Sequence, residues 1–204
     1  REAVGPKVLI AMDAHGRPRP GQAIKMIRAL EPYDLYFFEE PVPPDNVAAF
    51  KRLAEANLNV NLATGERLFT KWGYTELIEN QYVDIIQPDV CHDGGILETR
   101  KIAAMAEAYY IRVAPHNPNG PVATAASLQL GACLPNFCIL EYAQNQPWRD
   151  QILQEPLQIV DGSVALPEKP GLGIELNFAE IAKLPYQPRD YQGSFWPDGG
   201  VADI

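Results

Sequence analysis

Ionisable side chains recur at nearly even spacing along the first two thirds of this chain. One acidic or histidine residue is found roughly every 25 residues, in the order Asp13, Glu39, Glu66, Asp89, His116 and Glu141. Carboxylates are the hard oxygen ligands that Mg²⁺ prefers, and histidine is a common general acid or base. The series therefore predicts one site for metal-assisted or acid–base chemistry, assembled from several separate segments.

Taken singly, each of these residues has an ordinary explanation as a helix cap, a turn residue or a solvated loop residue. The regular recurrence argues against six separate coincidences. Three carboxylates from successive segments, Asp13, Glu39 and Glu66, would repel one another strongly unless a cation lay between them. We therefore expect these three residues to bind Mg²⁺. We also expect Asp89 to orient His116 by a hydrogen bond and so to make the imidazole a stronger base.

Each member of the series lies at the end of a short apolar run. The runs are continuous, as expected for parallel strands that are buried on both faces. They are Lys7–Met12, Leu35–Phe38, Leu58–Ala63, Val83–Gln87, Tyr110–Ala114 and Phe137–Leu140. Apolar residues three apart predict helices between the runs, with Asn46 as the cap of one helix and Pro121 in the first turn of another. Alternating strands and helices predict βαβ units and a parallel sheet.

Two architectures are compatible with such units. In a (β/α)₈ barrel the carboxyl ends of all strands meet at one mouth, where enzymes with this fold carry their catalytic residues. In a doubly wound sheet the strand ends are spread along a line, and only those near the switch point meet. Because six strand ends contribute to one series, we expect the barrel.

The chain divides by composition at residue 147. Residues 1–146 carry the repeated units and are predicted to form a partial barrel that is the catalytic domain. Residues 147–204 are rich in proline, glycine and aromatic residues and predict an irregular tail, with one short helix near Phe178–Lys183.

The charge balance and the apolar content exclude several classes of protein. The 204 residues contain 17 Lys and Arg against 26 Asp and Glu, a formal net charge of −9. A nucleic-acid surface needs clustered cations, so we expect no nucleic-acid partner. No apolar run has the length of a membrane span, and no signal peptide is visible. The spacing of Cys91, Cys133 and Cys138 fits neither a disulfide framework nor a metal site, which favours a cytoplasmic protein.

Six motifs together resemble those of the enolase superfamily. They are MDAHGR, FFEEPVPP, ATGERLF, IIQPDVCHDGG, APHNPNGP and LEYA. Within that superfamily they are similar to the mandelate racemase subgroup, and in particular to acid-sugar dehydratases of the galactonate dehydratase type. The resemblance implies an α/β fold that is the C-terminal part, about strands 3–8, of a (β/α)₇–₈ TIM-type barrel. The N-terminal capping domain and the first strands would then be absent, and the tail would pack on the barrel and on that domain.

The resemblance also implies a role for each member of the series. The metal ligands are Asp13, Glu39 and Glu66; the base is His116 with its partner Asp89; and the two further acids are Glu141 and His15. Because His15 is two residues beyond Asp13, both side chains would point to the same side of an extended strand.

The implied reaction is the dehydration of a sugar acid with Mg²⁺ as cofactor. His116 would abstract the C2 proton to give an enediolate, and Glu141 would hydrogen-bond to that intermediate. His15 would protonate the departing C3 hydroxyl, which leaves as water to give a 2-keto-3-deoxy sugar acid. The family resemblance further implies a homo-oligomer.

Two other functions remain open at this point. A racemase or epimerase of an α-hydroxy acid could use the same scaffold, but it would need a second base from a region that this sequence lacks. A catalytically silent binding or assembly protein would have no reason to keep the complete set of acidic and histidine residues. Arg17 and Asn117 flank members of the series and could either contact substrate or stabilise loops.

Overall fold

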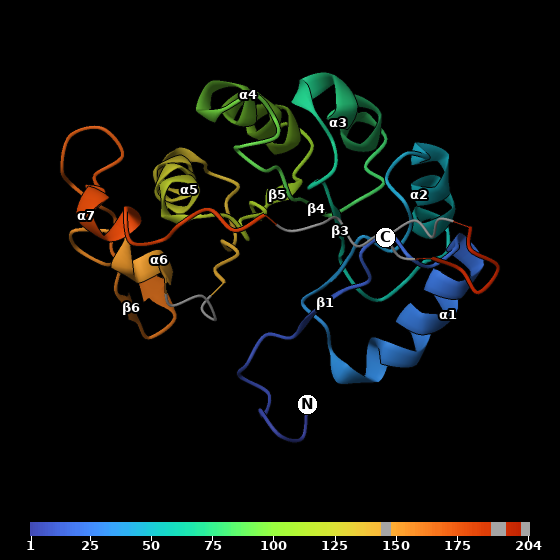
Figure 1. The fold of residues 1–204 in the computed structure, drawn as a ribbon. Helices are drawn as coiled ribbons and strands as arrows, with labels where there is room; N and C mark the ends of the chain where they lie inside the picture. Colours follow the sequence, from blue (N-terminus) through green and yellow to red (C-terminus); the bar gives the residue numbers. More distant parts are fainter. Residues whose placement is uncertain (144–147, 189–194, 201–204) are drawn as a thin grey trace.

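A five-stranded parallel sheet with helices on its outer face forms the main body of the molecule. The structure is a computed structural model that describes residues 1–143, 148–188 and 195–200. The strands are β1 Ala11–Asp13, β2 Phe37–Glu39, β3 Leu62–Thr64, β4 Ile85–Ile86 and β5 Arg112–Val113. The helices between and after them are α1 Pro20–Leu30, α2 Val47–Ala54, α3 Thr70–Glu79, α4 Ile96–Glu107 and α5 Pro121–Cys133. Figure 1 shows these helices as an arc around the strands.

The order of the strands agrees with a barrel. All pairs are parallel, and the spatial order β1-β2-β3-β4-β5 is the order along the chain. A doubly wound sheet would show a reversal of strand order at its switch point. The predicted α/β architecture, a section of a barrel-type sheet, is therefore confirmed.

The observed strands are shorter than the apolar runs that predicted them. The first run was expected to form a strand from Lys7, but β1 begins only at Ala11. Val8 and Leu9 are about half exposed, because no described strand pairs with this part of the chain. The last predicted run forms a single parallel bridge between Phe137 and Val113. It continues the sheet beside β5 without becoming a full strand.

The two faces of the sheet carry different apolar clusters. Outward-facing residues such as Phe38 and Ile86 join a large core with buried residues of the helices, among them Tyr74 and Leu77. The inner face has a small cluster that contains Phe37, Ala63, Ile85 and Ala114. Because side chains alternate along a strand, Glu39 lies on the same inner face as Phe37. The polar residues at the strand ends are thus directed toward the inside of the curved sheet.

The helix signals of the sequence are partly correct. Phe50 and Leu53 of α2 are buried, as their spacing predicts, and Pro121 begins α5. Asn46 occupies the N-cap position of α2, but its side chain makes no capping hydrogen bond. That part of the prediction is wrong, because the Asn46 side chain is turned to solvent and only its backbone oxygen bonds to the helix.

The tail contains more regular structure than its composition suggests. It forms α6 Trp148–Gln151, a hairpin of β6 Ile159–Val160 and β7 Ser163–Val164, and α7 Phe178–Ile181. These elements lie together beside α5 (Figure 1). Helix α7 confirms the predicted short helix, and Asn177 caps it by accepting a hydrogen bond from the Glu180 amide. The predicted domain boundary between residues 146 and 147 lies outside the described residues.

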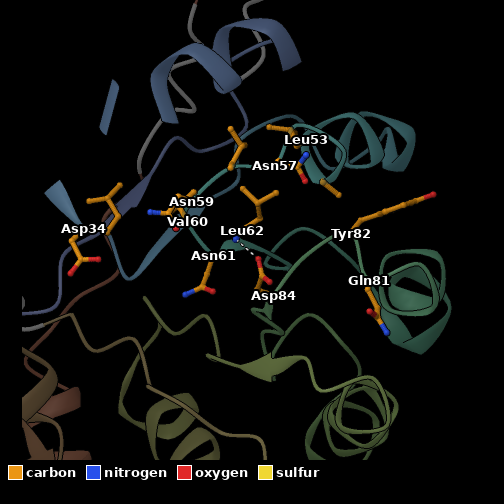
Figure 2. A pocket seen from close by; sticks show the side chains of 13 residues that line it. Asp34, Leu53, Asn57, Asn59, Val60, Asn61, Leu62, Gln81, Tyr82 and Asp84 are labelled. Carbon is orange, nitrogen blue, oxygen red and sulfur yellow. Dashed lines mark hydrogen bonds between the residues drawn. The ribbon is translucent and has the colours of Figure 1, made fainter. Parts of the chain in front are cut away.

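A polar cavity of about 490 Å³ lies at the amino ends of β2, β3 and β4. Figure 2 shows its lining, in which the Leu62 amide donates to Asp84 at 2.8 Å. None of the residues in the predicted catalytic series lines this cavity. Of the helices in the part of the chain that the structure describes, none is both long enough and apolar enough to cross a membrane.

One carboxyl group that is not in the predicted series is completely buried. Asp93, in the segment after β4, accepts a hydrogen bond from the Tyr74 hydroxyl at 3.1 Å, while its second oxygen has no partner among the described residues. Burial raises the pKa of Asp93 from 3.8 to about 7, although the Tyr74 hydrogen bond acts in the opposite direction. The negative charges of Asp89 and Glu98 add to the increase. The folded protein therefore resists ionisation of this group.

We predict that Asp93→Asn stabilises the protein at alkaline pH. The unfolded chain ionises Asp93 above its ordinary pKa, so this residue lowers the free energy of unfolding as pH rises from about 4 to about 7. In urea unfolding of the protein expressed from its complete coding sequence, the variant should be more stable by about 2 kcal/mol at pH 8 and by much less at pH 5. The exposed Asp45→Asn is the control, and an equal pH dependence of Asp93→Asn and wild type would contradict the prediction.

Candidate active site

Six of the seven predicted site residues line one cavity at the carboxyl ends of the strands. The cavity has a volume of about 410 Å³. The predicted residues on its wall are Asp13, His15, Glu39, Glu66, His116 and Glu141. The seventh, Asp89, is completely buried and contacts His116. The structure therefore brings the whole series together, although its members are spread over more than 120 residues of sequence.

The cavity lining carries four acidic residues, Asp13, Glu39, Glu66 and Glu141, and among the described lining residues no lysine or arginine balances their charge. Asp13 and Glu39 are directly paired in the parallel register of β1 and β2. Burial raises the pKa of the Glu39 carboxyl to about 7, although a hydrogen bond from Gln87 acts in the opposite direction. The negative charges of Asp13, Glu66 and Glu141 add to the increase. The described lining contains no lysine or arginine, so this oxygen-donor set fits a divalent cation.

A glycine allows the third carboxylate to approach the sheet. A Cβ atom on Gly65 would lie 2.7 Å from the Gln87 backbone nitrogen, and the φ of Gly65 is +153°. Only glycine therefore fits where β3 passes β4, directly before Glu66. Burial raises the pKa of Glu66, and the negative charge of Glu40 adds to this effect.

His116 and Asp89 form the predicted pair. The Nδ1 atom of His116 lies 2.8 Å from an Asp89 oxygen. Asp89 also accepts hydrogen bonds from the Cys91 amide at 2.7 Å and from Asn119 at 2.8 Å. Burial alone would raise the pKa of Asp89, but these three hydrogen bonds outweigh it and lower the pKa. Asp89 is thus held as a carboxylate behind the imidazole.

The free nitrogen of the imidazole faces two carboxylates. The Nε2 atom of His116 lies 3.5 Å from Glu66 and 4.0 Å from Glu141. Burial alone would lower the pKa of His116, but the hydrogen bond to Asp89 and the charges of Glu66 and Glu141 raise it above its usual value. Because Nδ1 is bonded to Asp89, Nε2 is the nitrogen that can gain or lose a proton on the cavity side.

Glu141 is fixed in place by the residue next to His116. The Asn117 amide donates to the Glu141 carboxylate at 2.8 Å, and the Asn117 side chain donates to the Glu141 carbonyl oxygen at 3.0 Å. Asn117 is completely buried and also bonds to Thr124 on α5. Of the two roles that the sequence left open for Asn117, the geometry supports loop positioning.

His15 lies beside the acidic cluster, as predicted, but for a different reason. Strand β1 ends at Asp13, and His15 has a φ of +49°, so the alternation of an extended strand does not place it. Instead its backbone amide donates to Asp13 at 2.6 Å. Its Nδ1 atom is 3.5 Å from Asp13 and 3.6 Å from Glu66. The tight turn after Asp13 therefore brings the His15 side chain into the cavity.

A second combination of possible metal donors overlaps the predicted one. Among the described residues, donor atoms of Asp13, His15 and Glu40 all lie within 4.8 Å of one another. Glu40 does not line the cavity, and both of its carboxylate oxygens accept hydrogen bonds from Arg67. The carboxylates that face the cavity are those of Asp13, Glu39 and Glu66.

Sequence reasoning did not find several polar residues around the site. Gln87 lines the cavity, and its side-chain oxygen is buried without a partner among the described residues. Its position two residues before Asp89 on an expected strand was the available signal. Asn119 holds Asp89, and His92 lies 3.1 Å from the Glu66 carbonyl oxygen through its Nδ1 atom. These contacts depend on loop conformations that spacing does not predict.

Known proteins match this chain along most of its length. A family model described as "Enolase C-terminal domain-like" matches residues 1–181. A D-galactonate dehydratase family member from Streptomyces bingchenggensis is 38% identical over 205 residues, which cover 100% of this chain and 50% of the relative. A D-xylonate dehydratase from Haloferax volcanii is 42% identical over 181 residues, covering 88% of this chain and 44% of the relative. The chain thus spans about half the length of these curated relatives.

Solved structures have the same fold. An enolase from Agrobacterium radiobacter, bound to sodium and L-malate, superposes with a TM-score of 0.92 at 36% identity. The match covers 100% of this chain and 55% of that one. A mandelate racemase/muconate lactonizing enzyme from Jannaschia sp. CCS1 gives a TM-score of 0.88 at 36% identity, covering 93% of this chain and 48% of that one.

We predict that Asp89→Asn lowers the pKa of His116. The substitution removes a negative charge and replaces a charge-assisted hydrogen bond by a neutral one, so less favours the protonated imidazole, while the effect of burial remains. Titration of the imidazole followed by NMR should show His116 losing its proton at lower pH than in wild type. Glu98→Gln, in the first turn of α4, where the carboxylate pairs with Lys71 and Lys101, should leave the titration unchanged. A titration of His116 that Asp89→Asn does not alter would mean that this carboxylate does not control the base.

Proposed function

The chain belongs to the enolase C-terminal domain-like family, and from this premise we propose that it carries the active site of a Mg²⁺-dependent sugar-acid dehydratase. The reaction removes the C2 proton and the C3 hydroxyl of an aldonate, galactonate-like in type, and gives a 2-keto-3-deoxy sugar acid. The observation that carries the proposal is the convergence of His15 and His116 on one acidic cavity. A D-galactonate dehydratase family member, a D-xylonate dehydratase and a solved relative bound to L-malate, an α-hydroxy acid, support this choice of substrate class.

The donor chemistry of the cavity suits the cofactor. Asp13, Glu39 and Glu66 present oxygen donors on a described lining that contains no lysine or arginine, and the raised pKa of Glu39 reflects burial and, to a smaller extent, repulsion by the neighbouring carboxylates. Mg²⁺ bound by these carboxylates would supply the positive charge that stabilises the substrate carboxylate as it gains electron density and makes the C2 proton removable.

His116 is the proposed base. Its Nδ1 atom is committed to Asp89, which leaves Nε2 as the nitrogen that faces the cavity and can accept the C2 proton. Asp89 holds the ring in the orientation that this transfer requires and stabilises the imidazolium that results.

Glu141 and His15 complete the reaction. Glu141 lies 4.0 Å from Nε2 of His116, where its carboxyl group can hydrogen-bond to the enediolate formed at C1 and C2. His15 approaches the cluster from the loop after β1, and as a protonated imidazole it can deliver a proton to the C3 hydroxyl. The hydroxyl then leaves as water, and the resulting enol converts to the keto acid.

The remaining parts of the proposal come from the sequence resemblance. We propose residues 1–146 as the catalytic domain and residues 147–204 as a tail that packs on it. Contacts such as the hydrogen bond from Gln129 on α5 to the Pro167 carbonyl oxygen support that packing. A cytoplasmic homo-oligomer is the corresponding proposal for location and assembly.

We predict that Mg²⁺ binding depends on the three carboxylates that face the cavity. Asp13→Asn, Glu39→Gln or Glu66→Gln, made in the protein expressed from its complete coding sequence, should weaken binding by more than about 100-fold, the upper range for loss of an outer-shell partner. Isothermal titration calorimetry measures the affinity, with Glu98→Gln as the matched control. If wild type bound no Mg²⁺, the proposal would fail and a catalytically silent binding protein would be favoured.

The two histidines should affect separate steps. His116→Asn should lower kcat by about 10²–10⁴-fold and also abolish exchange of the C2 proton with deuterated water. His15→Asn should lower the formation of keto acid by a similar factor but retain C2 exchange, because the base is intact.

A sugar-acid library screened for 2-keto-3-deoxy products identifies the substrate. Deuterium incorporation with inversion at C2, without loss of water, would instead indicate a racemase or epimerase.

A further inference from the structure

A buried ion pair lies directly behind the acidic cluster. The Glu40 side chain is completely buried. Arg67 donates to it from two nitrogens, Nε at 3.0 Å and Nη2 at 2.6 Å, one to each carboxylate oxygen. Such a bidentate pair fixes direction as well as distance, because two parallel hydrogen bonds define the plane of both groups.

Each member of this pair follows a cavity carboxylate in the sequence. Glu40 comes directly after Glu39 at the end of β2, and Arg67 comes directly after Glu66 beyond β3. One peptide unit therefore connects each charged partner to an oxygen donor of the cavity. The ion pair joins the same two strand ends as the two carboxylates, and neither of its members lines the cavity.

The backbone around Glu40 joins three strand ends. Its amide donates to the Ala63 carbonyl oxygen at 2.9 Å, and its carbonyl oxygen accepts from the Gly16 amide at 2.9 Å. Glu40 has a φ of +39°, an uncommon conformation for a residue with a side chain. Gly16 has a φ of +65°, and a Cβ atom there would overlap Nη2 of Arg67. Any side chain at position 16, in the loop that also carries His15, would therefore displace the Arg67 guanidinium.

The geometry does not favour Glu40 as a metal ligand, although its oxygen lies near Asp13 and His15. Both carboxylate oxygens already accept hydrogen bonds from a cation, Arg67. A metal ion at Glu40 would therefore lie close to a guanidinium charge and compete with it for the same lone pairs. Glu39 lines the cavity, whereas Glu40 does not.

We propose that Glu40 and Arg67 are positioning residues, which set the separation of the Glu39 and Glu66 carboxylates for a divalent cation and touch neither cation nor substrate. This inference rests on the proposed metal-dependent function. Removal of either member releases the restraint between the two strand ends, so the carboxylates no longer present donors at the spacing that a small cation requires.

The test compares four variants in the protein expressed from its complete coding sequence: Glu40→Gln, Arg67→Met, Arg67→Lys and the double variant Glu40→Gln/Arg67→Met. Glu39→Gln is the reference variant, in which a proposed metal ligand is lost. Glu98→Gln, which disrupts an ion pair with Lys71 on the outer helices, is the matched control. Mg²⁺ affinity is measured by calorimetry, thermal unfolding is measured in metal-free protein, and kcat and KM are measured at saturating Mg²⁺.

Glu40→Gln and Arg67→Met should each weaken Mg²⁺ binding by about 10–100-fold, while Glu39→Gln weakens it further. The Mg²⁺ affinity of the double variant should be no lower than that of the single variant that binds Mg²⁺ more weakly. Both substitutions break the same ion pair, so their effects should not add. Arg67→Lys keeps the charge without the bidentate geometry and should be intermediate. Saturating Mg²⁺ should restore much of kcat in the single variants, as expected for residues that act through the metal ligands.

Three outcomes would overturn the inference. If metal-free stability falls but the Mg²⁺ affinity of folded protein is unchanged, the pair is structural only. If Glu40→Gln loses binding as completely as Glu39→Gln while Arg67→Met strengthens it, Glu40 is itself a ligand. In either case wild type still binds Mg²⁺ and turns over sugar acids, so the proposed function stands. Absence of Mg²⁺ binding by wild type would instead overturn both the function and this inference.

Discussion

Repulsion among carboxylates that the parallel register forces together is the constraint on which the site depends. The register of β1 and β2 sets Asp13 beside Glu39, and burial removes water that would otherwise screen their charges. Two kinds of contact place positively charged or protonatable groups beside these carboxylates. The imidazoles of His15 and His116 lie near Glu66, and the Arg67 guanidinium binds Glu40, which does not line the cavity. The cavity itself is left with a deficit of positive charge.

Carboxyl groups of one residue type acquire opposite properties within this small region. The pKa of Asp89 is lowered because three donors surround it, whereas burial raises that of Asp93, four residues further along the chain. Asp89 can therefore act as a permanent anion behind a base. The difference arises from donors supplied by loops, since both side chains are buried. Because both groups are buried to the same extent, the hydrogen-bond donors around Asp89 explain why its carboxyl group is ionised more readily than that of Asp93.

The sequence predicts the site better than the contacts that hold it. Even spacing of ionisable residues is enough to foresee that Asp13 and Glu141 share a cavity, because strand ends of a barrel-type sheet converge. The contact between Glu40 and Arg67 depends instead on a left-handed backbone conformation at Glu40, for which the pattern gives no signal. Strand lengths were overestimated for a related reason. An apolar run such as Lys7–Met12 predicts a buried strand, but a strand forms only where a partner strand lies beside it, and here that begins at Ala11.

The left-handed backbone of His15 has an evolutionary consequence. Asparagine, aspartate and histidine tolerate this conformation better than most residues, and glycine adopts it freely. A single codon change can thus replace the imidazole while the turn over Asp13 keeps its shape, because that turn is held by a backbone amide. Under the proposed mechanism His15 serves only the departure of the hydroxyl group. The capacity for elimination can therefore be gained or lost in one mutational step, independently of proton abstraction, which depends on a different segment of the chain.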